Sequence, residues 1–323
     1  MTSYGYEIGY GKHRVPVYRV YASPLHGVTA IPESSFVGRP NELFACDVDV
    51  EVVGDDFLPA YTEGDNRMVV ATDSMKNFVL RQALAYDGAT LEGFLAFLGH
   101  GFTATYPQLR KLRLTAHELP FVATTVPDPT DDRAFSPSDV LFTRSHDDRS
   151  IATLEVSADG DTADVTAHRC GRVGLQLLKI TGSSFTSFVR DGYTTLPDRR
   201  DRPLYIHLDV FWRYTDVADL LAPEPTRYVP GEQVRDLVQT VFAGFVSESI
   251  QHLVHEIGVR LLDRFPQLAE VSFRAENRTR DPVAESDADP RVKVYSDPFS
   301  AYGVITLTMT RDTNAQNSRR GGS

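Results

Sequence analysis

Apolar and polar side chains alternate with a period of two in three segments of the N-terminal half. The clearest is Phe44–Val52, in which even-numbered positions are apolar and odd-numbered positions are mostly acidic. Tyr10–Tyr21 and Leu109–Val122 show the same pattern less regularly. This period is typical of an antiparallel strand with one buried and one wet face, so all three segments are expected to be strands.

Between the second and third of these strands, apolar residues recur at the spacing of one helical face, which predicts two helices. Thr72 or Asp73 could cap the first helix, and Thr90 could cap the second, because their side-chain oxygens can accept from free backbone N–H groups. The apolar positions are Met75, Phe78, Val79, Ala83 and Tyr86 in the first helix and Leu91, Phe94, Leu95, Leu98 and Phe102 in the second.

The C-terminal half repeats this order of elements. Before it, Val126–Ser150 is rich in Asp, Pro and Ser and is expected to be a loop or an interdomain connection. Two apolar stripes at helical spacing, at residues 234–245 and 250–261, predict a second pair of helices. The strands expected in this half are Ile151–Val156, Thr162–Arg169, Val173–Thr181, Leu204–Trp212, Glu270–Arg274 and Tyr302–Met309.

The repeated order predicts an α+β protein of two tandem units, each an antiparallel sheet with two helices on one face. The expected domains are residues 1–150 and 151–312. Residues 313–323 are expected to form a disordered tail.

The second face of each predicted sheet carries polar side chains. In the first sheet these are Asp47, Asp49 and Glu51, and in the second they are His207 and Asp209. Such a face could line a solvent-filled interior, form a polar interface or simply lie in solvent.

Composition narrows the class of protein. The 323 residues include 33 basic and 44 acidic side chains, so the net charge of −11 does not favour binding to nucleic acid or anionic lipid. No apolar run is long enough to span a membrane, and Met1–Val20 lacks the apolar core of a secretory signal. Cys46 and Cys170 provide no disulfide framework, and the chain does not end in Ser-Lys-Leu, so the cytoplasm is the expected compartment.

Two other motifs were considered as a phosphate-binding loop and as a metal site, and neither fits. Gly9–His13 does not have the spacing of a phosphate-binding loop. His252 and His255 stand one helical turn apart, but the sequence offers no Cys or third His as an evident further ligand for a metal there. A solvated helix face is therefore expected there, and no metal site is predicted.

Five short motifs stand in order between residues 10 and 279. They are Tyr10-Gly11-Lys12, Thr72-Asp73-Ser74-Met75-Lys76-Asn77, Phe185…Phe188…Asp191…Tyr193-Thr194-Thr195-Leu196…Asp201-Arg202, Ser249-Ile250-Gln251 and Asn277-Arg278-Thr279. Together they resemble the signature motifs of the urate oxidase (uricase) family.

The resemblance implies both a fold and a reaction. The fold is two tunnelling-fold (T-fold) units per chain, with four chains forming a barrel-like homotetramer whose active sites lie at subunit interfaces. The reaction takes urate, dioxygen and water to 5-hydroxyisourate and hydrogen peroxide, with no metal or organic cofactor.

The resemblance also implies binding roles. Phe185 would stack on the flat urate ring, and the Arg202 guanidinium would contact a carbonyl oxygen and a ring nitrogen together. The Gln251 side chain and the Ile250 backbone N–H would hold the opposite edge. The partner subunit would contribute Thr72 and the backbone of Asp73.

Four positions would take part in the chemistry. Lys12 and Thr72 would form the proton relay, and Asn277 would hold dioxygen or the attacking water. Thr279 occupies the position at which many members carry His, so the third member of the relay departs from the family pattern.

Two other functions are compatible with part of this pattern. Other T-fold proteins are pteridine enzymes, which typically anchor the ring with a Glu and in some cases use zinc. A purine-binding protein without catalysis would also use Phe185, Arg202 and Gln251. Metal content would distinguish the first from a urate oxidase, and urate binding without oxygen uptake would identify the second.

Overall fold

The computed structural model describes residues 4–145, 148–160, 162–278, 280–298 and 300–311, and within them the chain forms two compact units. The described parts of Met1–Thr29, Val37–Cys170 and Asp216–Tyr228 make up unit 1. Those of Ala30–Phe36, Gly171–Thr215 and Val229–Ser323 make up unit 2.

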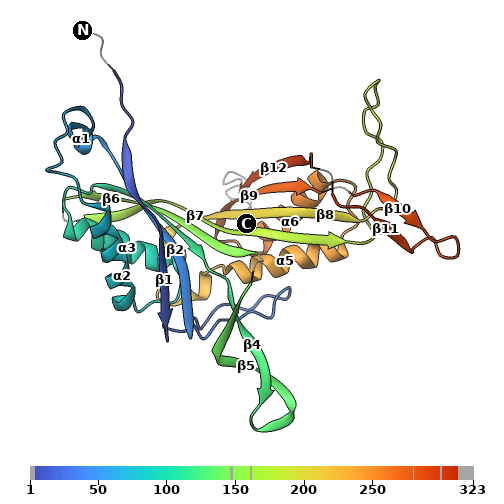
Figure 1. The fold of residues 1–323 in the computed structure, drawn as a ribbon, viewed down its shortest axis with the longest axis horizontal. Coiled ribbons are helices and arrows are strands. Elements are labelled where there is room, and N and C mark those ends of the chain that lie inside the picture. The colour runs from blue at the N-terminus through green and yellow to red at the C-terminus, as the bar shows by residue number, and fades with distance from the viewer. Residues whose placement is uncertain (1–3, 146–147, 161, 279, 299, 312–323) are drawn as a thin grey trace, which may run out of the picture. The chain divides into compact units, whose positions relative to one another are not determined.

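Unit 1 is an antiparallel sheet with helices against one face (Figure 1). Its main sheet has the order β1-β2-β3-β6-β7. Its strands are β1 (Gly9–Val20), β2 (Leu43–Val53), β3 (Lys111–Glu118), β4 (Phe121–Asp128), β5 (Asp131–Arg144), β6 (Arg149–Asp159) and the first part of β7 (Thr162–Lys179). Its helices are η1 (Asp55–Phe57), α1 (Leu58–Thr62), α2 (Thr72–Ala85), α3 (Leu91–Thr105), α4 (Val217–Leu221) and η2 (Pro225–Arg227).

Burial in β2 follows the predicted alternation. Val48, Val50 and Val52 have no exposed surface, whereas Asp49 and Glu51 between them are half-buried. Burying one such valine stabilises the fold by roughly 1.5–3 kcal/mol, so the register of this strand is strongly determined. The opposite face is the wet one that the sequence predicted.

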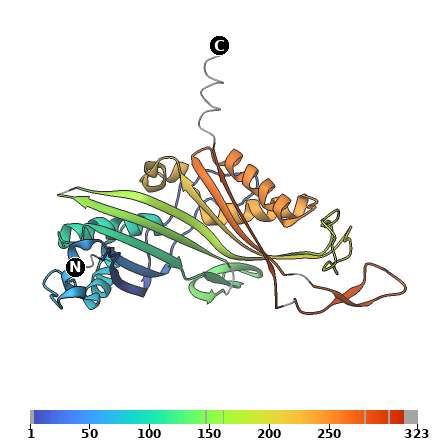
Figure 2. The ribbon, with the colours of Figure 1, turned by 90° about the horizontal axis from the view of Figure 1, so that it is seen from above.

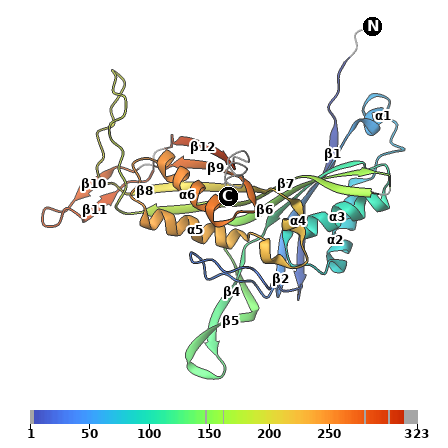
Figure 3. The ribbon, with the colours of Figure 1, turned by 180° about the vertical axis from the view of Figure 1, so that it is seen from behind.

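Both predicted helices of this half are present as α2 and α3, and Figure 3 shows them beside the strands of unit 1. Thr90 caps α3 as predicted, since its side chain accepts from the Gly93 N–H at 3.1 Å. The predicted cap of α2 is wrong. Ala71 occupies the N-cap position without a side-chain bond, and Thr72 and Asp73 lie inside the first turn.

The prediction of a loop over Val126–Ser150 is also wrong. β4 and β5 pair as an antiparallel hairpin, drawn in green, that extends away from the main sheet of unit 1 (Figure 1). None of the described residues of β4 and β5 is buried, and apolar residues such as Phe135 and Val140 are exposed. Periodicity could not identify these strands because cross-strand hydrogen bonds, not burial of one face, define them.

Unit 2 repeats the architecture. Its main sheet has the order β7-β8-β9-β12, and Figure 2 shows α5 and α6 side by side along one face of it. The strands after β7 are β8 (Leu204–Tyr214), β9 (Leu268–Asn277), β10 (Pro282–Glu285), β11 (Lys293–Tyr295) and β12 (Gly303–Thr310). The helices are α5 (Gly231–Gly244) and α6 (Ile250–Arg264).

Two features of the C-terminal half differ from the prediction. Thr162–Arg169 and the predicted strand that begins at Val173 are parts of one strand, β7, which continues through Gly174 at a φ of +81° and ends at Lys179. Glycine tolerates this conformation, so the strand bends without ending. The β10–β11 hairpin, which follows the Asn277 motif, was not predicted.

The α+β prediction of antiparallel sheets, each with a helix pair, is confirmed in both units. The predicted domain boundary at residues 150 and 151 falls at the start of β6, whereas the two units divide at Cys170 and Gly171. Residues 1–150 and 151–312 therefore stay a prediction as domains, and the tail at 313–323 lies outside the described residues. Among the residues that the structure describes, no helix is long and apolar enough to cross a membrane.

Candidate active site

In unit 1, the Tyr-Gly-Lys motif lies in β1 against β2. Lys12 is half-buried and stands opposite Val50, one of the valines that face the helices. A β-carbon on Gly11 would lie 1.9 Å from the Val50 carbonyl oxygen, so only glycine fits there. The glycine of the motif therefore lets the two backbones approach closely beside Lys12.

The Thr-Asp motif lies in the first turn of α2. Asp73 forms an ion pair with Lys76 at 2.6 Å and accepts from the Asn77 amide at 3.0 Å. The hydrogen bond and charge of Lys76, with a weaker contribution from Lys12, lower the pKa of Asp73. The charge of Lys12 therefore acts on the start of α2, where Thr72 is half-buried.

In unit 2, the long motif forms the loop between β7 and β8. Its base is anchored by mutual backbone hydrogen bonds between Phe185 and Arg199 at 2.7 and 3.0 Å. Asp201 accepts from the Gly182 N–H at 2.8 Å. The loop also pairs with the segment that precedes α6, because Ser184 donates to the Ser247 carbonyl at 2.8 Å. These contacts explain why a segment without regular structure holds a defined shape.

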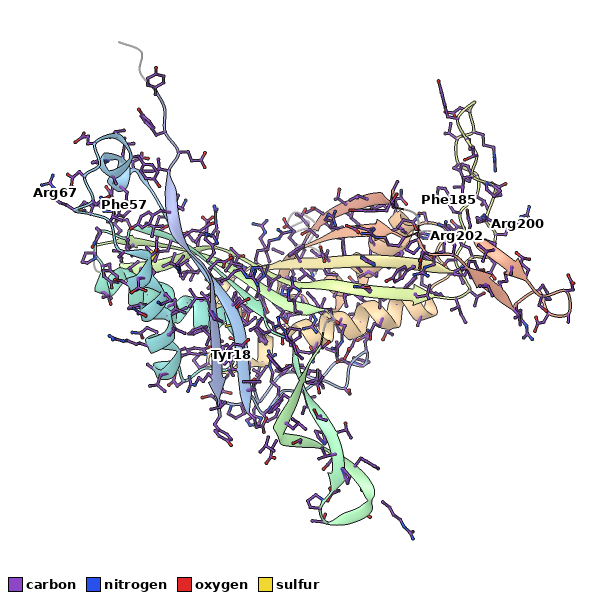
Figure 4. The ribbon with its side chains drawn as sticks, viewed as in Figure 1. Tyr18, Phe57, Arg67, Phe185, Arg200 and Arg202 are labelled. Carbon is purple, nitrogen blue, oxygen red and sulfur yellow. The ribbon has the colours of Figure 1, made fainter. Side chains whose placement is uncertain are left out.

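Phe185 and Arg202 meet at the base of this loop. The Arg202 guanidinium carbon lies 5.6 Å from the centre of the Phe185 ring, and Figure 4 shows the two labelled side chains close together. Phe188 stacks on Phe185 with ring centres 4.9 Å apart and planes 9° apart. The aromatic pair therefore forms a flat apolar wall beside a cation.

Arg202 is half-buried, and within the described residues it has no ion-pair partner. Its Nε atom is buried without a hydrogen-bond acceptor. Burial, and then the charge of Arg199, lowers the pKa of Arg202, but a guanidinium still remains charged at neutral pH. A half-buried cation without a carboxylate fits an anionic ligand.

The glutamine motif forms the start of α6. Ser249 is its N-cap, and its side chain accepts from the His252 N–H at 3.0 Å. Ile250 is buried at the first helical position, while Gln251 is exposed. A helix start presents backbone N–H groups and a partial positive charge, which suits an anionic or carbonyl-edged ligand.

Asn277 ends β9 opposite Ile206 of β8 and Gly303 of β12. Its Oδ1 atom is buried with no hydrogen-bond partner among the residues that are described. Asn277 also lines a cavity of about 430 Å³ with Arg199 and Tyr302. Thr279, the departure from the family pattern, lies outside the described residues.

Sequence reasoning missed the neighbour of Asn277. Glu276 is 7% exposed and accepts hydrogen bonds from both Arg274 and Arg278, while His207 lies 4.0 Å away. Burial opposes ionisation of Glu276, but the two arginine hydrogen bonds outweigh it and lower its pKa. The alternation of β9 could have placed Glu276 on the sheet face opposite Phe273 and Ala275, but it could not have identified the arginine partners.

The structure thus gathers the predicted residues into two groups. Lys12, Thr72 and Asp73 lie together in unit 1. The start of α6, the base of the long loop and Asn277 belong to unit 2. His252 and His255 are exposed on α6, and the part of the chain that the structure describes contains no group of three or more His, Cys, Asp or Glu residues able to hold a metal.

A family model described as "Uricase" matches residues 8–151 and 168–306. These ranges include every predicted site residue. The chain belongs to the uricase family. It is similar to the uricase of Haloferax volcanii, with 49% identity over 94% of this chain and 98% of the relative. It is also 44% identical to the uric acid degradation bifunctional protein PucL of Bacillus subtilis, of which the match covers 61%.

The crystal structure of urate oxidase from Bacillus sp. TB-90 resembles the whole fold. Its TM-score is 0.91 at 40% identity, and the match covers 94% of this chain and 100% of that one. The prediction of two tandem T-fold units is therefore confirmed. Family membership also explains why five short motifs kept their order through both units.

Proposed function

We propose that this protein catalyses the oxidation of urate by dioxygen and water to 5-hydroxyisourate and hydrogen peroxide, without a metal or organic cofactor. The observation that carries the proposal is the half-buried Arg202 guanidinium, which has no carboxylate partner among the described residues and lies against the Phe185 ring. A flat anion with carbonyl edges satisfies both groups at once. Urate is such an anion.

The unit 2 residues would bind and orient urate. Phe185 would contribute dispersion and apolar contact to the ring face. Arg202 would donate two charge-assisted hydrogen bonds to one edge, and the Ile250 N–H and Gln251 amide would hold the other. Asn277 has an amide oxygen without a partner in the described structure, which suits it to hold dioxygen or water above the ring.

The unit 1 residues would move the proton. Urate must lose a proton before it transfers an electron to dioxygen, and Lys12 would accept that proton through the Thr72 hydroxyl. An amine accepts a proton through its free electron pair, so the Lys12 amine would act as the general base. Thr279 would relay protons through water at the position where many members carry His.

We further propose that the site is shared between subunits of a homotetramer. Lys12, Thr72 and Asp73 of one subunit would complete the group of Phe185, Arg202 and their neighbours in its partner. A cytoplasmic location is part of the same proposal and is supported by Cys46 and Cys170, which are buried free thiols.

The activity is tested with chelator-treated protein and no added cofactor. Loss of the ultraviolet absorbance of urate, with one dioxygen consumed per urate, is the expected result. Binding of urate under nitrogen without oxygen uptake in air would instead identify a purine-binding protein. Absence of both would refute the proposal.

Sharing of the site is tested by complementation. Lys12→Met and Arg202→Gln are each expected to be inactive. Random co-assembly of the two should restore about one quarter of wild-type activity, because some interfaces then join an intact Lys12 to an intact Arg202. No recovery in verified mixed tetramers would show that each site uses one chain.

A further inference from the structure

The register between β1 and β2 changes immediately after Lys12. Lys12 stands opposite Val50, and Val15 stands opposite Val48, so His13 and Arg14 together face the single position of Asp49. This is a β-bulge, with two residues opposite one. Directly opposed residues in an antiparallel pair share a face, and Val48 and Val50 are both fully buried on the helix face.

The bulge therefore decides the direction of Lys12. Val15 and Val17 are buried, and in an unbroken strand Lys12 would point to the opposite face from both. The extra residue reverses the alternation, so Lys12 and Val15 both point toward the helices. The start of α2 with Thr72 lies on that side, because Tyr10, which stands opposite the buried Val52, accepts from the Val70 N–H just before α2.

The carboxylate of Asp49 holds the bulge. Its Oδ1 atom accepts from the Arg14 backbone N–H at 2.6 Å. Its Oδ2 atom lies 3.5 Å from Nδ1 of His13 and 3.8 Å from Nε2 of His117. Arg14 has a φ of +54°, a left-handed conformation that its β-carbon disfavours, so the bulge needs a contact that maintains it.

Unit 2 contains the same contact on a different residue. Gly174 of β7, at a φ of +81°, donates its N–H to Oδ1 of Asp209 at 2.8 Å. Glycine adopts positive φ readily, so this bend does not depend on its carboxylate. Only the contact in unit 1 combines a disfavoured residue with an adjacent lysine of the proposed site.

We propose that Asp49 is a positioning residue for Lys12 in urate oxidation. Its carboxylate accepts the Arg14 N–H and so maintains the bulge that turns Lys12 toward Thr72. Asp49 lies on the opposite face of the sheet from Lys12 and acts through the backbone, without touching substrate. The inference rests on the proposed function, in which Lys12 accepts the proton of urate.

The first comparison is Asp49→Ala against the matched control Asp209→Ala. The measurements are kcat and KM from urate and oxygen consumption, and Kd from titration with urate under nitrogen. Asp49→Ala should lower kcat by about tenfold or more and change the Kd for urate by less than about twofold, because misplacing a reacting group affects the chemical step. Asp209→Ala should keep kcat within about twofold, since Gly174 needs no such support.

The second comparison restores the bulge without the carboxylate. Arg14→Gly added to Asp49→Ala should recover most of the lost kcat, because glycine adopts the left-handed conformation unaided. Asp49→Asn keeps an oxygen that can accept the Arg14 N–H, so it should also retain most of kcat and provides a second test if Asp49→Ala does not fold.

The outcomes separate the two proposals. A wild-type protein that does not oxidise urate would refute the proposed function. With active wild-type protein, an unchanged kcat in Asp49→Ala would overturn the positioning role, as would an equal loss in Asp209→Ala. Failure of Arg14→Gly to restore kcat, or an Asp49→Asn loss as large as that of Asp49→Ala, would overturn the bulge-holding mechanism.

Discussion

The phenol oxygen of Tyr10 accepts a hydrogen bond from the backbone N–H of Val70 at 3.0 Å. Lys12 lies two residues beyond Tyr10, and Thr72 lies two residues beyond Val70. The contact therefore ties the strand that carries the proposed base to the segment that carries its proposed relay partner. Burial raises the pKa of Tyr10, although the hydrogen bond from Val70 opposes this shift, so the phenol is neutral at physiological pH.

Removing this hydroxyl should affect both stability and catalysis. Tyr10→Phe leaves the Val70 N–H without its partner, which should lower the free energy of unfolding by about 1–3 kcal/mol. It should also lower kcat, because Lys12 and Thr72 lose their fixed spacing. Tyr61→Phe is the control, since the exposed Tyr61 hydroxyl donates to the Gly9 carbonyl at 2.8 Å and water can replace it. Equal losses in both variants would contradict a specific role for Tyr10.

The two ends of the proposed relay should differ in importance. Lys12→Ala should lower kcat by about a hundredfold or more, the usual contribution of a positioned general base. Thr279→Ala should retain more activity, because an amine is a stronger base than a hydroxyl and water can replace the hydroxyl. The comparison uses initial rates of urate loss at saturating urate. The same loss of turnover in both variants would show this ordering to be wrong.

Arg202 should be needed for its shape as well as its charge. Arg202→Lys keeps the positive charge but cannot form two parallel hydrogen bonds to one ligand edge. Loss of one charge-assisted hydrogen bond, about 1.5–3 kcal/mol, predicts a Kd for urate that is weaker by about 10- to 150-fold. Arg200→Lys is the matched control, because Arg200 is exposed. Titration with urate under nitrogen measures both values, and equal affinities would argue against bidentate binding.

Glu92 should make stability depend on pH. It is buried at the start of α3, where it accepts from the Tyr228 hydroxyl at 3.1 Å, and burial raises its pKa. An unfolded glutamate has a pKa of about 4.3. Above that value the native state keeps a proton that the unfolded state releases, so this group's contribution to stability falls as pH rises toward its native pKa.

Replacing the acid by an amide removes that dependence. Glu92→Gln keeps an oxygen that accepts from Tyr228 and cannot ionise. At pH values above the native pKa of Glu92, the thermal unfolding midpoint of the variant should exceed that of the wild type. The difference should shrink as pH falls toward about 4.3, the pKa of an unfolded glutamate. Thermal unfolding across this pH range measures it. A difference that does not vary with pH would mean that Glu92 has an ordinary pKa.

Hydrophobic periodicity predicted some elements of the two units and not others. β2, α2, α3 and their counterparts in unit 2 were predictable because each buries one face, and burial imposes a period of 2 or 3.6 on neighbouring residues. The β4–β5 hairpin was not, since residues such as Phe135 are exposed and leave no such period. The continuity of β7 was hidden for a related reason, because Gly174 resembles a break until its backbone is seen.

Some features of the proposed site were likewise predictable from the sequence, and others depend on tertiary contacts. By itself, the sequence determined the family, the repeated order of elements and the residues that stand in its motifs, because these depend on residue identity and short spacing. Only the tertiary structure decided that Asp49 meets the Arg14 backbone and that Tyr10 meets Val70. Those contacts join residues 35 and 60 positions apart and depend on strand register and helix docking. A bulge changes that register with a single residue, so the direction of Lys12 follows from how β1 and β2 pair and not from the pattern of β1 alone.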